Sequence, residues 1–256
     1  MEFTFGIITS GCTNQNLSRI VDSIHAMNIP VFEIIVVGPA ETCALPGVSF
    51  IQFDESLRPN WITRKKNMIC QLAKYENIVL LHDYVVFHHD WYNGFLRFGN
   101  SFDVCINRIL NQDGTRFRDY TLFPFYMQSI DTKFSTQCLL PYNFKLTPIT
   151  AKLSYISGSY YVVKKHIALQ YPLDETKSWG GGEDVEFSYR TACHGIVAQM
   201  NPHSVVSFLK YKSIPAWDVE ITDTRLLILL NSLTAKDVER WKRDPACFHL
   251  FPILHI

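Results

Sequence analysis

Short apolar runs rich in β-branched residues alternate with stretches of helical periodicity along this chain. Five such runs predict strands, at 3–8, 32–38, 48–53, 77–83 and 156–165. Apolar residues spaced three and four apart predict helices at about 16–27, 61–75, 90–98 and 183–194. Strands that alternate with helices are typical of α/β folds with a parallel sheet.

The pattern also suggests how the chain is divided. We expect residues 1–214 to form one α/β domain and residues 215–256 to form a helical extension packed on it. The segment "TDTRLLILLNSLTAKDVERWKRD" predicts two helices, and "FHLFPILHI" closes the chain. We expect this apolar end to pack on the domain, and a peripheral membrane or partner contact is the alternative.

Composition narrows the class of protein. The 256 residues carry 24 Lys and Arg against 24 Asp and Glu, which gives no overall attraction for nucleic acid or an anionic membrane. No apolar run is long enough to span a bilayer, and no targeting segment opens the chain, so we expect a cytoplasmic protein. The 7 cysteines include no Cys-x-x-Cys pair and are expected to be reduced core residues.

Polar residues that follow strands are the first candidates for a ligand site, because α/β sheets bind ligands at the carboxyl ends of their strands. Thr9 and Ser10 follow the first strand in a loop of small polar residues. His82 and Asp83 end the strand at 77–83, where a carboxylate commonly bonds a metal, a ribose or loop amides. The cluster His82, His88, His89 and Asp90 matches no zinc spacing, so His88 and His89 are interpreted as surface residues.

Two lysines lie on the apolar side of the helix predicted at 61–75. On a helical wheel, Lys65 and Lys66 fall within the arc that carries Ile62, Ile69 and Leu72. Cations in the first turn of a helix oppose its dipole unless an anion lies there, as a bound diphosphate would. The alternative is that both side chains extend past the core to solvent.

The stretch "SWGGGEDVEFSYR" at 178–190 is the most informative part of the sequence. Gly181 and Gly182 allow the backbone to approach a ligand closely, and Trp179 offers a flat apolar face on which a sugar can stack. Glu183 and Asp184 open the following helix, where acids are also favoured simply by the helix dipole. We expect Val185, Tyr189 and Ala192 to be buried, which leaves Asp184 facing a cleft.

These segments together resemble the nucleotide-sugar glycosyltransferases of the GT-A fold, especially family 2 and its relatives. The resemblance covers about residues 3–210 and is most specific at "WGGGEDVEFSYR". It implies a Rossmann-like, mixed and mostly parallel central sheet flanked by helices. It also implies transfer of a sugar from a nucleoside-diphosphate donor, with UDP favoured, to a glycan or other hydroxyl acceptor.

The resemblance assigns roles to the candidate residues. It implies inversion, with Asp184 as the general base and Glu183 as a partner of the acceptor. Trp179, Gly181 and Gly182 would contact the sugar or the acceptor. The donor side would comprise Thr9, Ser10, Lys65, Lys66, Asn67, His82 and Asp83.

The sequence departs from the family at the expected metal site. A Mn²⁺ or Mg²⁺ ion usually binds a second acid of the strand motif, and Tyr84 stands there, which leaves Asp83 as the single candidate ligand. The family's late histidine has no clear counterpart, because His203 is expected to precede a strand that Lys210 and Lys212 follow. A lysine there, such as Lys210, is expected to substitute for the metal's charge.

Two further interpretations concern the rest of the donor and acceptor sites. Gly38 stands where the family has an acid that reads the base, so Asp54 or Glu41 is expected to compensate. The Asp-Gly turn in "NQDGTRFRDYTLF" predicts a hairpin that projects Arg116, Arg118 and Asp119 toward the donor or acceptor, or only into solvent.

Two other classes of function remain open. A catalytically silent nucleotide- or sugar-binding protein is consistent with the acid lost at Tyr84. A nucleotidyltransferase is disfavoured, because the loop "TSGCTNQN" after the first strand carries no lysine or arginine.

Overall fold

The structure, a computed structural model, describes residues 1–11, 14–39, 45–122, 138–213, 219–237 and 239. Its strands are β1 (Phe3–Ile8), β2 (Phe32–Gly38), β3 (Val48–Gln52), β4 (Asn77–His82), β5 (Val85–Phe87), β6 (Val104–Leu110), β7 (Thr121–Leu122), β8 (Cys138–Leu139), β9 (Ser154–Tyr155), β10 (Tyr160–Lys164), β11 (Gln199–Phe208) and β12 (Val219–Glu220). Its helices are α1 (Asn14–His25), α2 (Ile62–Leu72), α3 (Trp91–Phe98), α4 (Lys165–Gln170), α5 (Glu183–Cys193) and α6 (Thr224–Ser232), with a 3₁₀ helix η2 (Thr150–Leu153).

The main sheet has the strand order β3-β2-β1-β4-β10-β6-β11-β5. β1 pairs in parallel with β2 and β4, and β11 pairs in parallel with β6. β10 is antiparallel to β4 and β6, and β5 is antiparallel to β11. The sheet is therefore mixed and mostly parallel, which confirms the fold class expected from the sequence.

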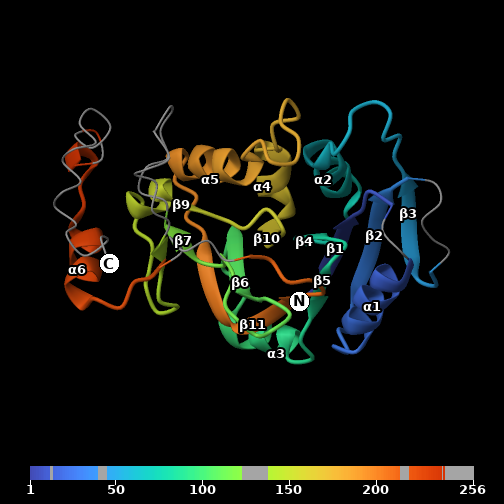
Figure 1. The fold of residues 1–256 in the computed structure, drawn as a ribbon, viewed down its shortest axis with the longest axis horizontal. Coiled ribbons are helices and arrows are strands. Elements are labelled where there is room, and N and C mark those ends of the chain that lie inside the picture. The colour runs from blue at the N-terminus through green and yellow to red at the C-terminus, as the bar shows by residue number, and fades with distance from the viewer. Residues whose placement is uncertain (12–13, 40–44, 123–137, 214–218, 238, 240–256) are drawn as a thin grey trace.

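Alternating side chains supply the two faces of this sheet. In β2, Ile34 and Val36 join one apolar cluster, whereas Ile35 and Val37 join another. Helices α1 and α3 lie on one side of the sheet and α2, α4 and α5 lie on the other (Figure 1). Both faces are buried, so the strands are nearly continuous apolar runs in the sequence.

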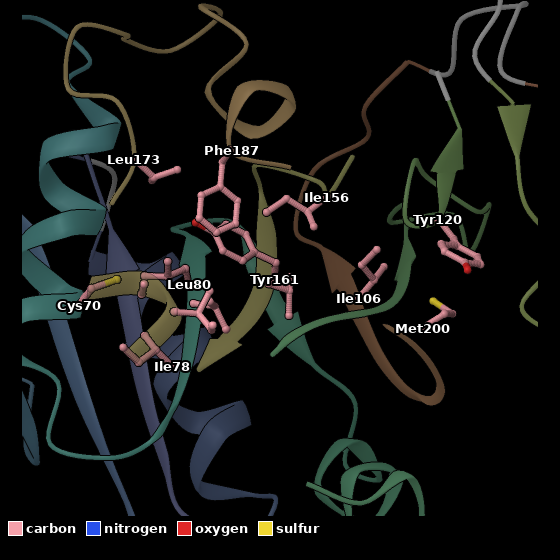
Figure 2. Close-up of a cluster of buried hydrophobic side chains, with 14 of the residues drawn as sticks. Cys70, Ile78, Leu80, Ile106, Tyr120, Ile156, Tyr161, Leu173, Phe187 and Met200 are labelled. Carbon is pink, nitrogen blue, oxygen red and sulfur yellow. The ribbon is translucent and has the colours of Figure 1, made fainter. Parts of the chain in front are cut away.

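The face under α5 explains how that helix is held. Phe187 of α5 lies beside Tyr161 of β10, with ring centroids 6.0 Å apart, and Leu173 and Ile156 flank them (Figure 2). The buried residues of α5 include Phe187 and Thr191 as well as Ala192, whereas Val185 and Tyr189 are only partly buried. The expected stripe was therefore wrong at two positions, because α5 packs on β9 and η2 with a face rotated from the predicted one.

A second, smaller sheet has the order β12-β8-β7-β9. Its strand β12 comes from the region expected to form the C-terminal extension and pairs in parallel with β8. Leu230 of α6 and Leu233 after it are buried in the same apolar cluster as Phe187. The division at residue 214 stays a prediction, and the apolar end at 240–256 lies outside the described residues.

Several smaller expectations need correction. His203 lies within β11 rather than before it, and the strand expected at 156–165 begins only at Tyr160, because residues 157–160 form a turn closed by a hydrogen bond from the Tyr160 amide to the Ser157 carbonyl. Three described cysteines are buried, but Cys193 is exposed. Within the described ranges, no helix has the length and apolar character needed to cross a membrane.

The strand directions determine where a site can form. The carboxyl ends of β1, β4 and β11 lie at one edge of the main sheet, together with the amino end of antiparallel β10. Ser10, Asp83, Lys210 and the turn at 157–159 all follow or precede these ends directly. This edge therefore gathers the polar residues that the sequence spreads over 200 positions.

Candidate active site

Two adjoining cavities open at this edge of the sheet. The larger has a volume of about 580 Å³ and is lined by the turn at 157–159, by Arg118 and by residues 179–185. The smaller has a volume of about 330 Å³ and is lined by the ends of β1 and β4 and by Lys210. Both share His82, Tyr84, Trp179 and Lys212, so they form one continuous cleft.

Asp184 borders the larger cavity at the start of α5. Its Oδ2 accepts a hydrogen bond from the Gly158 amide at 2.9 Å, and its Oδ1 accepts one from the Val185 amide at 2.9 Å. A Cβ added to Gly158 would lie 2.8 Å from Glu183 Oε1 and 2.9 Å from Asp184 Oδ2. The absence of a side chain at Gly158 therefore lets both carboxylates pack against the backbone of this turn.

Glu183 is almost buried, with 6% of its surface exposed. Burial raises the pKa of its carboxyl, and Lys66, whose Nζ lies 3.8 Å from Oε1, opposes that shift. Burial likewise lowers the pKa of Lys66, and the nearby Glu183 and Asp184 oppose it. Burial thus favours the neutral forms of Glu183 and Lys66, whereas Asp184 is the more accessible acid in the cleft.

The glycine-rich loop before α5 shapes the mouth of the larger cavity. Trp179 is 69% exposed and lines both cavities, so its apolar face is open to a ligand. Gly182 is the N-cap of α5 and adopts a left-handed conformation, with φ 68° and ψ 37°. Residues other than glycine rarely adopt this conformation, so a glycine here lets the loop turn directly into the helix.

Helix α2 and its N-cap residue Trp61 hold the segment that leads into this loop. The Asn67 side chain donates to the Leu173 carbonyl at 2.9 Å and accepts from the Leu173 amide at 2.9 Å. The Trp61 indole donates to the Glu175 carbonyl, and the Thr63 hydroxyl donates to the Lys177 carbonyl. Asn67, expected on the donor side, lies outside the lining of both cavities and instead anchors the segment that leads to Trp179.

Lys65 and Lys66 point inward, as the helical wheel predicts, and each has only 1% of its surface exposed. Lys65 donates to the Thr9 carbonyl at 2.8 Å, pairs with Glu55 and lines the smaller cavity. Lys66 donates to the Gly158 carbonyl at 2.7 Å and does not line either cavity. The alternative of solvent-exposed lysines was wrong, and both ammonium groups hold turns at the edge of the sheet.

Four other predicted donor residues are divided between the cleft and the surface. Thr9, Ser10 and Asp83 line the smaller cavity, and no described residue forms a hydrogen bond or ion pair with the Asp83 carboxylate. Asp54 instead is exposed and accepts hydrogen bonds from the Ser56 amide and hydroxyl, which lower its pKa. The expectation that Asp54 reaches the donor is therefore not supported by its position. Glu41 lies outside the described residues.

His82 lies where the two cavities meet. Burial, and then the positive charges of Lys66 and Lys212, lower the pKa of its imidazole well below the ordinary value. His82 is therefore neutral at physiological pH and adds no charge to the cleft.

The segment at 111–122 brings only one of its three candidates to the cleft. Arg118 lines the larger cavity. Arg116 Nε instead donates to Asp119 Oδ1 at 2.7 Å, and Asp119 is fully buried and also accepts from the Tyr142 hydroxyl. The expectation for Arg116 and Asp119 was wrong, because their charges pair with each other inside the hairpin rather than facing a ligand.

Sequence reasoning gave too little weight to the turn at 157–159 and to Lys212. Lys212 Nζ donates to the Tyr84 hydroxyl at 2.7 Å and to Ser159 Oγ at 3.1 Å. The signal available in the sequence was the pair of lysines two residues apart after β11, which places both at the same edge of the sheet.

Comparison with solved structures agrees with this architecture. The structure resembles GalNAc-T7, solved with UDP, GalNAc and Mn²⁺, with a TM-score of 0.57 and 12% identity over 94% of this chain and 49% of that chain. It also resembles S. aureus TarS 1–349, solved in complex with UDP, with a TM-score of 0.52 and 10% identity over 81% of this chain and 60% of that chain. Both are GT-A glycosyltransferases. The chain has a GT-A fold.

At these identities the likeness concerns the fold alone, and this chain spans about half to three fifths of the two proteins. No protein-family model matches the sequence, and no curated protein matches it. The expected GT-A architecture is nevertheless confirmed, and the cleft lies at the carboxyl edge of its sheet.

The residues in the cleft do not fit a divalent metal ion of the kind solved with GalNAc-T7. Within the described ranges, no group of three or more His, Cys, Asp or Glu residues could hold a metal. Asp83 is the single acid at the end of β4, and burial raises the pKa of the adjacent Tyr84 phenol to about 12. A neutral phenol that accepts a hydrogen bond from an ammonium group is a poor ligand for Mn²⁺ or Mg²⁺.

Proposed function

We propose that this chain is a glycosyltransferase that moves a sugar from a nucleoside-diphosphate donor to a hydroxyl group of an acceptor, with inversion of the anomeric carbon. The observation that carries the proposal is the position of Asp184. Its carboxylate lines the larger cavity, in a GT-A fold, and Lys210 and Lys212, which follow β11, line the adjoining smaller one. The cleft would therefore offer both a base for the acceptor and positive charge for a leaving diphosphate.

Asp184 would remove the proton from the acceptor hydroxyl. The hydroxyl oxygen then forms a bond to the anomeric carbon, the bond from that carbon to the phosphate oxygen breaks, and the nucleoside diphosphate leaves with the electron pair. Hydrogen bonds from the Gly158 and Val185 amides support this role, because they fix the carboxylate and leave further lone pairs for the acceptor proton.

Trp179 and Glu183 would position the sugar and the acceptor. An exposed indole beside the acid provides the apolar surface on which a sugar ring stacks. Glu183 would act through its contacts with Gly158 and Lys66 more than as a second base, because it is nearly buried.

The smaller cavity would hold the nucleotide. Thr9 and Ser10 follow β1 and would approach the base or ribose, and Asp83, which has no protein partner among the described residues, would accept from ribose hydroxyls. UDP is the favoured nucleotide, since both similar structures were solved with it.

The test is transfer of radiolabelled sugars from a panel of UDP-sugars by purified protein, with Asp184→Asn as the variant. A well-placed general base contributes roughly 10²–10⁴ in rate, so the variant should lose that factor in kcat with nearly unchanged UDP affinity. Glu186→Gln is the matched control, because Glu186 is another acid of the first turn of α5 but does not line either cavity.

Two results would contradict the mechanism. Full turnover by Asp184→Asn would show that Asp184 is not the general base. A product that retains the donor's anomeric configuration would exclude a single displacement at the anomeric carbon. UDP binding without transfer or hydrolysis of any donor would instead favour a silent nucleotide-binding protein, the class that the Tyr84 substitution keeps open.

A further inference from the structure

We propose that Lys210 and Lys212, arranged around the ring of Tyr84, form a fixed cationic site that binds the donor's diphosphate without a divalent metal ion. The inference rests on the proposed function for the identity of the ligand. A fold that was solved with Mn²⁺ in GalNAc-T7 has a single acid, Asp83, directly after β4 in this chain.

Lys212 is built into the junction of the two cavities. Its ammonium group donates to Tyr84 Oη and Ser159 Oγ, and it lines both cavities. An ammonium group has three protons to donate, so two fixed hydrogen bonds leave one for a ligand. Its position is therefore determined before any ligand binds.

Lys210 supplies the second charge. Its Nζ lies 4.0 Å from the centre of the Tyr84 ring, and Nζ of Lys212 lies 4.5 Å from the same centre. No described residue forms an ion pair or hydrogen bond with the Lys210 ammonium, which lines the smaller cavity beside Asp83. The aromatic ring attracts both cations and so brings two like charges to one place.

The electrostatics of the cleft favour an anion at this place. Burial lowers the pKa of Lys212 to about 8, and the positive charges of Lys210 and Arg118 act in the same direction. The positive charges of Lys210, Arg118 and Lys66 lower the pKa of Lys212, and the negative charge of Asp184 opposes this shift. A bound diphosphate would relieve this excess of positive charge and raise the pKa of Lys212 again.

The same charges disfavour a divalent cation. A metal ion bound to Asp83 would share the smaller cavity with the Lys210 ammonium, and the Tyr84 oxygen already accepts from Lys212. Fixed ammonium groups can stabilise phosphate charge as a metal does, though without requiring carboxylate ligands. Tyr84 therefore has two effects: it replaces the second acid of the strand motif, and its ring and hydroxyl hold the ammonium groups of Lys210 and Lys212.

The experiment measures UDP binding by isothermal titration calorimetry, once in EDTA and once in MnCl₂, with inorganic pyrophosphate as a probe that needs no base recognition. Wild-type protein should bind UDP in EDTA, and Mn²⁺ should change the Kd by less than about threefold. Lys210→Ala and Lys212→Gln should each weaken binding in EDTA by about tenfold or more. Lys74→Ala, an exposed lysine that lines neither cavity, is the matched control.

Three results would overturn the inference: no UDP or pyrophosphate binding in EDTA, a gain of more than about tenfold from Mn²⁺, or unchanged affinity in both lysine variants. Lys210 is exposed, so Lys210→Ala keeps the test valid if Lys212→Gln does not fold. Binding is read without turnover. If Asp184→Asn kept full turnover, the proposed general base would be wrong, but the binding result for the two lysines would still hold. If UDP binding required a metal, the lysine site would be wrong, but the proposed transferase activity would still hold.

Discussion

Replacing Gly158 with alanine tests whether the two acids of the cleft are held by close contact with the turn before β10. Gly158 does not have a positive φ, so its backbone would accept an alanine without conformational strain. The new Cβ would meet Glu183 Oε1 at 2.8 Å and Asp184 Oδ2 at 2.9 Å, whereas ordinary contacts begin at 3.4 Å. Both carboxylates, or the turn itself, must therefore move by about half an ångström.

This displacement should separate catalysis from binding. A misplacement of about 1 Å can lower a rate by about 10²-fold, so half of it should lower kcat about tenfold. Overpacking should also lower the free energy of unfolding by about 1–3 kcal/mol. UDP affinity should remain nearly unchanged, because Thr9, Ser10 and Lys210 lie in the other cavity and Lys212 keeps its hydrogen bond to Tyr84.

The assay compares kcat and the UDP Kd of Gly158→Ala with those of wild type, alongside urea unfolding. Ser157→Ala is the control for damage to the turn, because it removes the hydrogen bond from Ser157 to Ser159 but adds no atom. Wild-type kcat together with wild-type stability would refute the reasoning, since it would mean that the acids do not depend on the space at Gly158. A parallel loss in Ser157→Ala would point to general damage of the turn.

Three further predictions follow from single contacts. UDP affinity should fall as the pH rises through about 8, where Lys212 loses its proton in the free protein. Lys212→Arg should flatten this pH dependence, because arginine keeps its charge. A wild-type UDP affinity that does not change with pH in calorimetry would contradict this prediction. Arg116→Ala leaves the buried Asp119 charge without its cation and should cost about 3–5 kcal/mol in urea unfolding; lost UDP affinity at wild-type stability would contradict a purely structural role. Trp179→Ala should raise KM for donor or acceptor with an unchanged melting temperature, because the exposed indole contributes little to the core; a large drop in melting temperature would contradict this.

Much of the fold could be predicted from the sequence, because the decisive pattern is local. The strands at 3–8 and 32–38 were located to the residue, since a strand buried on both faces is a run of apolar residues whatever it pairs with. The strand order was not accessible in this way. On α5 the helical periodicity predicted the wrong residues to be buried, because this helix packs on β9 and η2 with a different face.

The candidate site shows the same division. Glu183 and Asp184 could be found because a glycine-rich loop followed by two acids is contiguous in the sequence, and both lie in the cleft. Their assigned roles remain predictions. Asn67, Arg116 and Asp119 look equally polar in the sequence, but buried partners satisfy them away from the cavities.

The sequence by itself determined the strands at 3–8 and 32–38, that a glycine-rich loop precedes two acids, and that Tyr84 stands in place of a second acid. Only the tertiary structure decided that Lys66 and Asp184 meet at Gly158, and that Lys212 meets Tyr84 across 128 positions. The physical reason is that apolar burial depends on patterns within a few residues. The partner of a buried polar group depends instead on which strand ends become neighbours, here β4 and antiparallel β10.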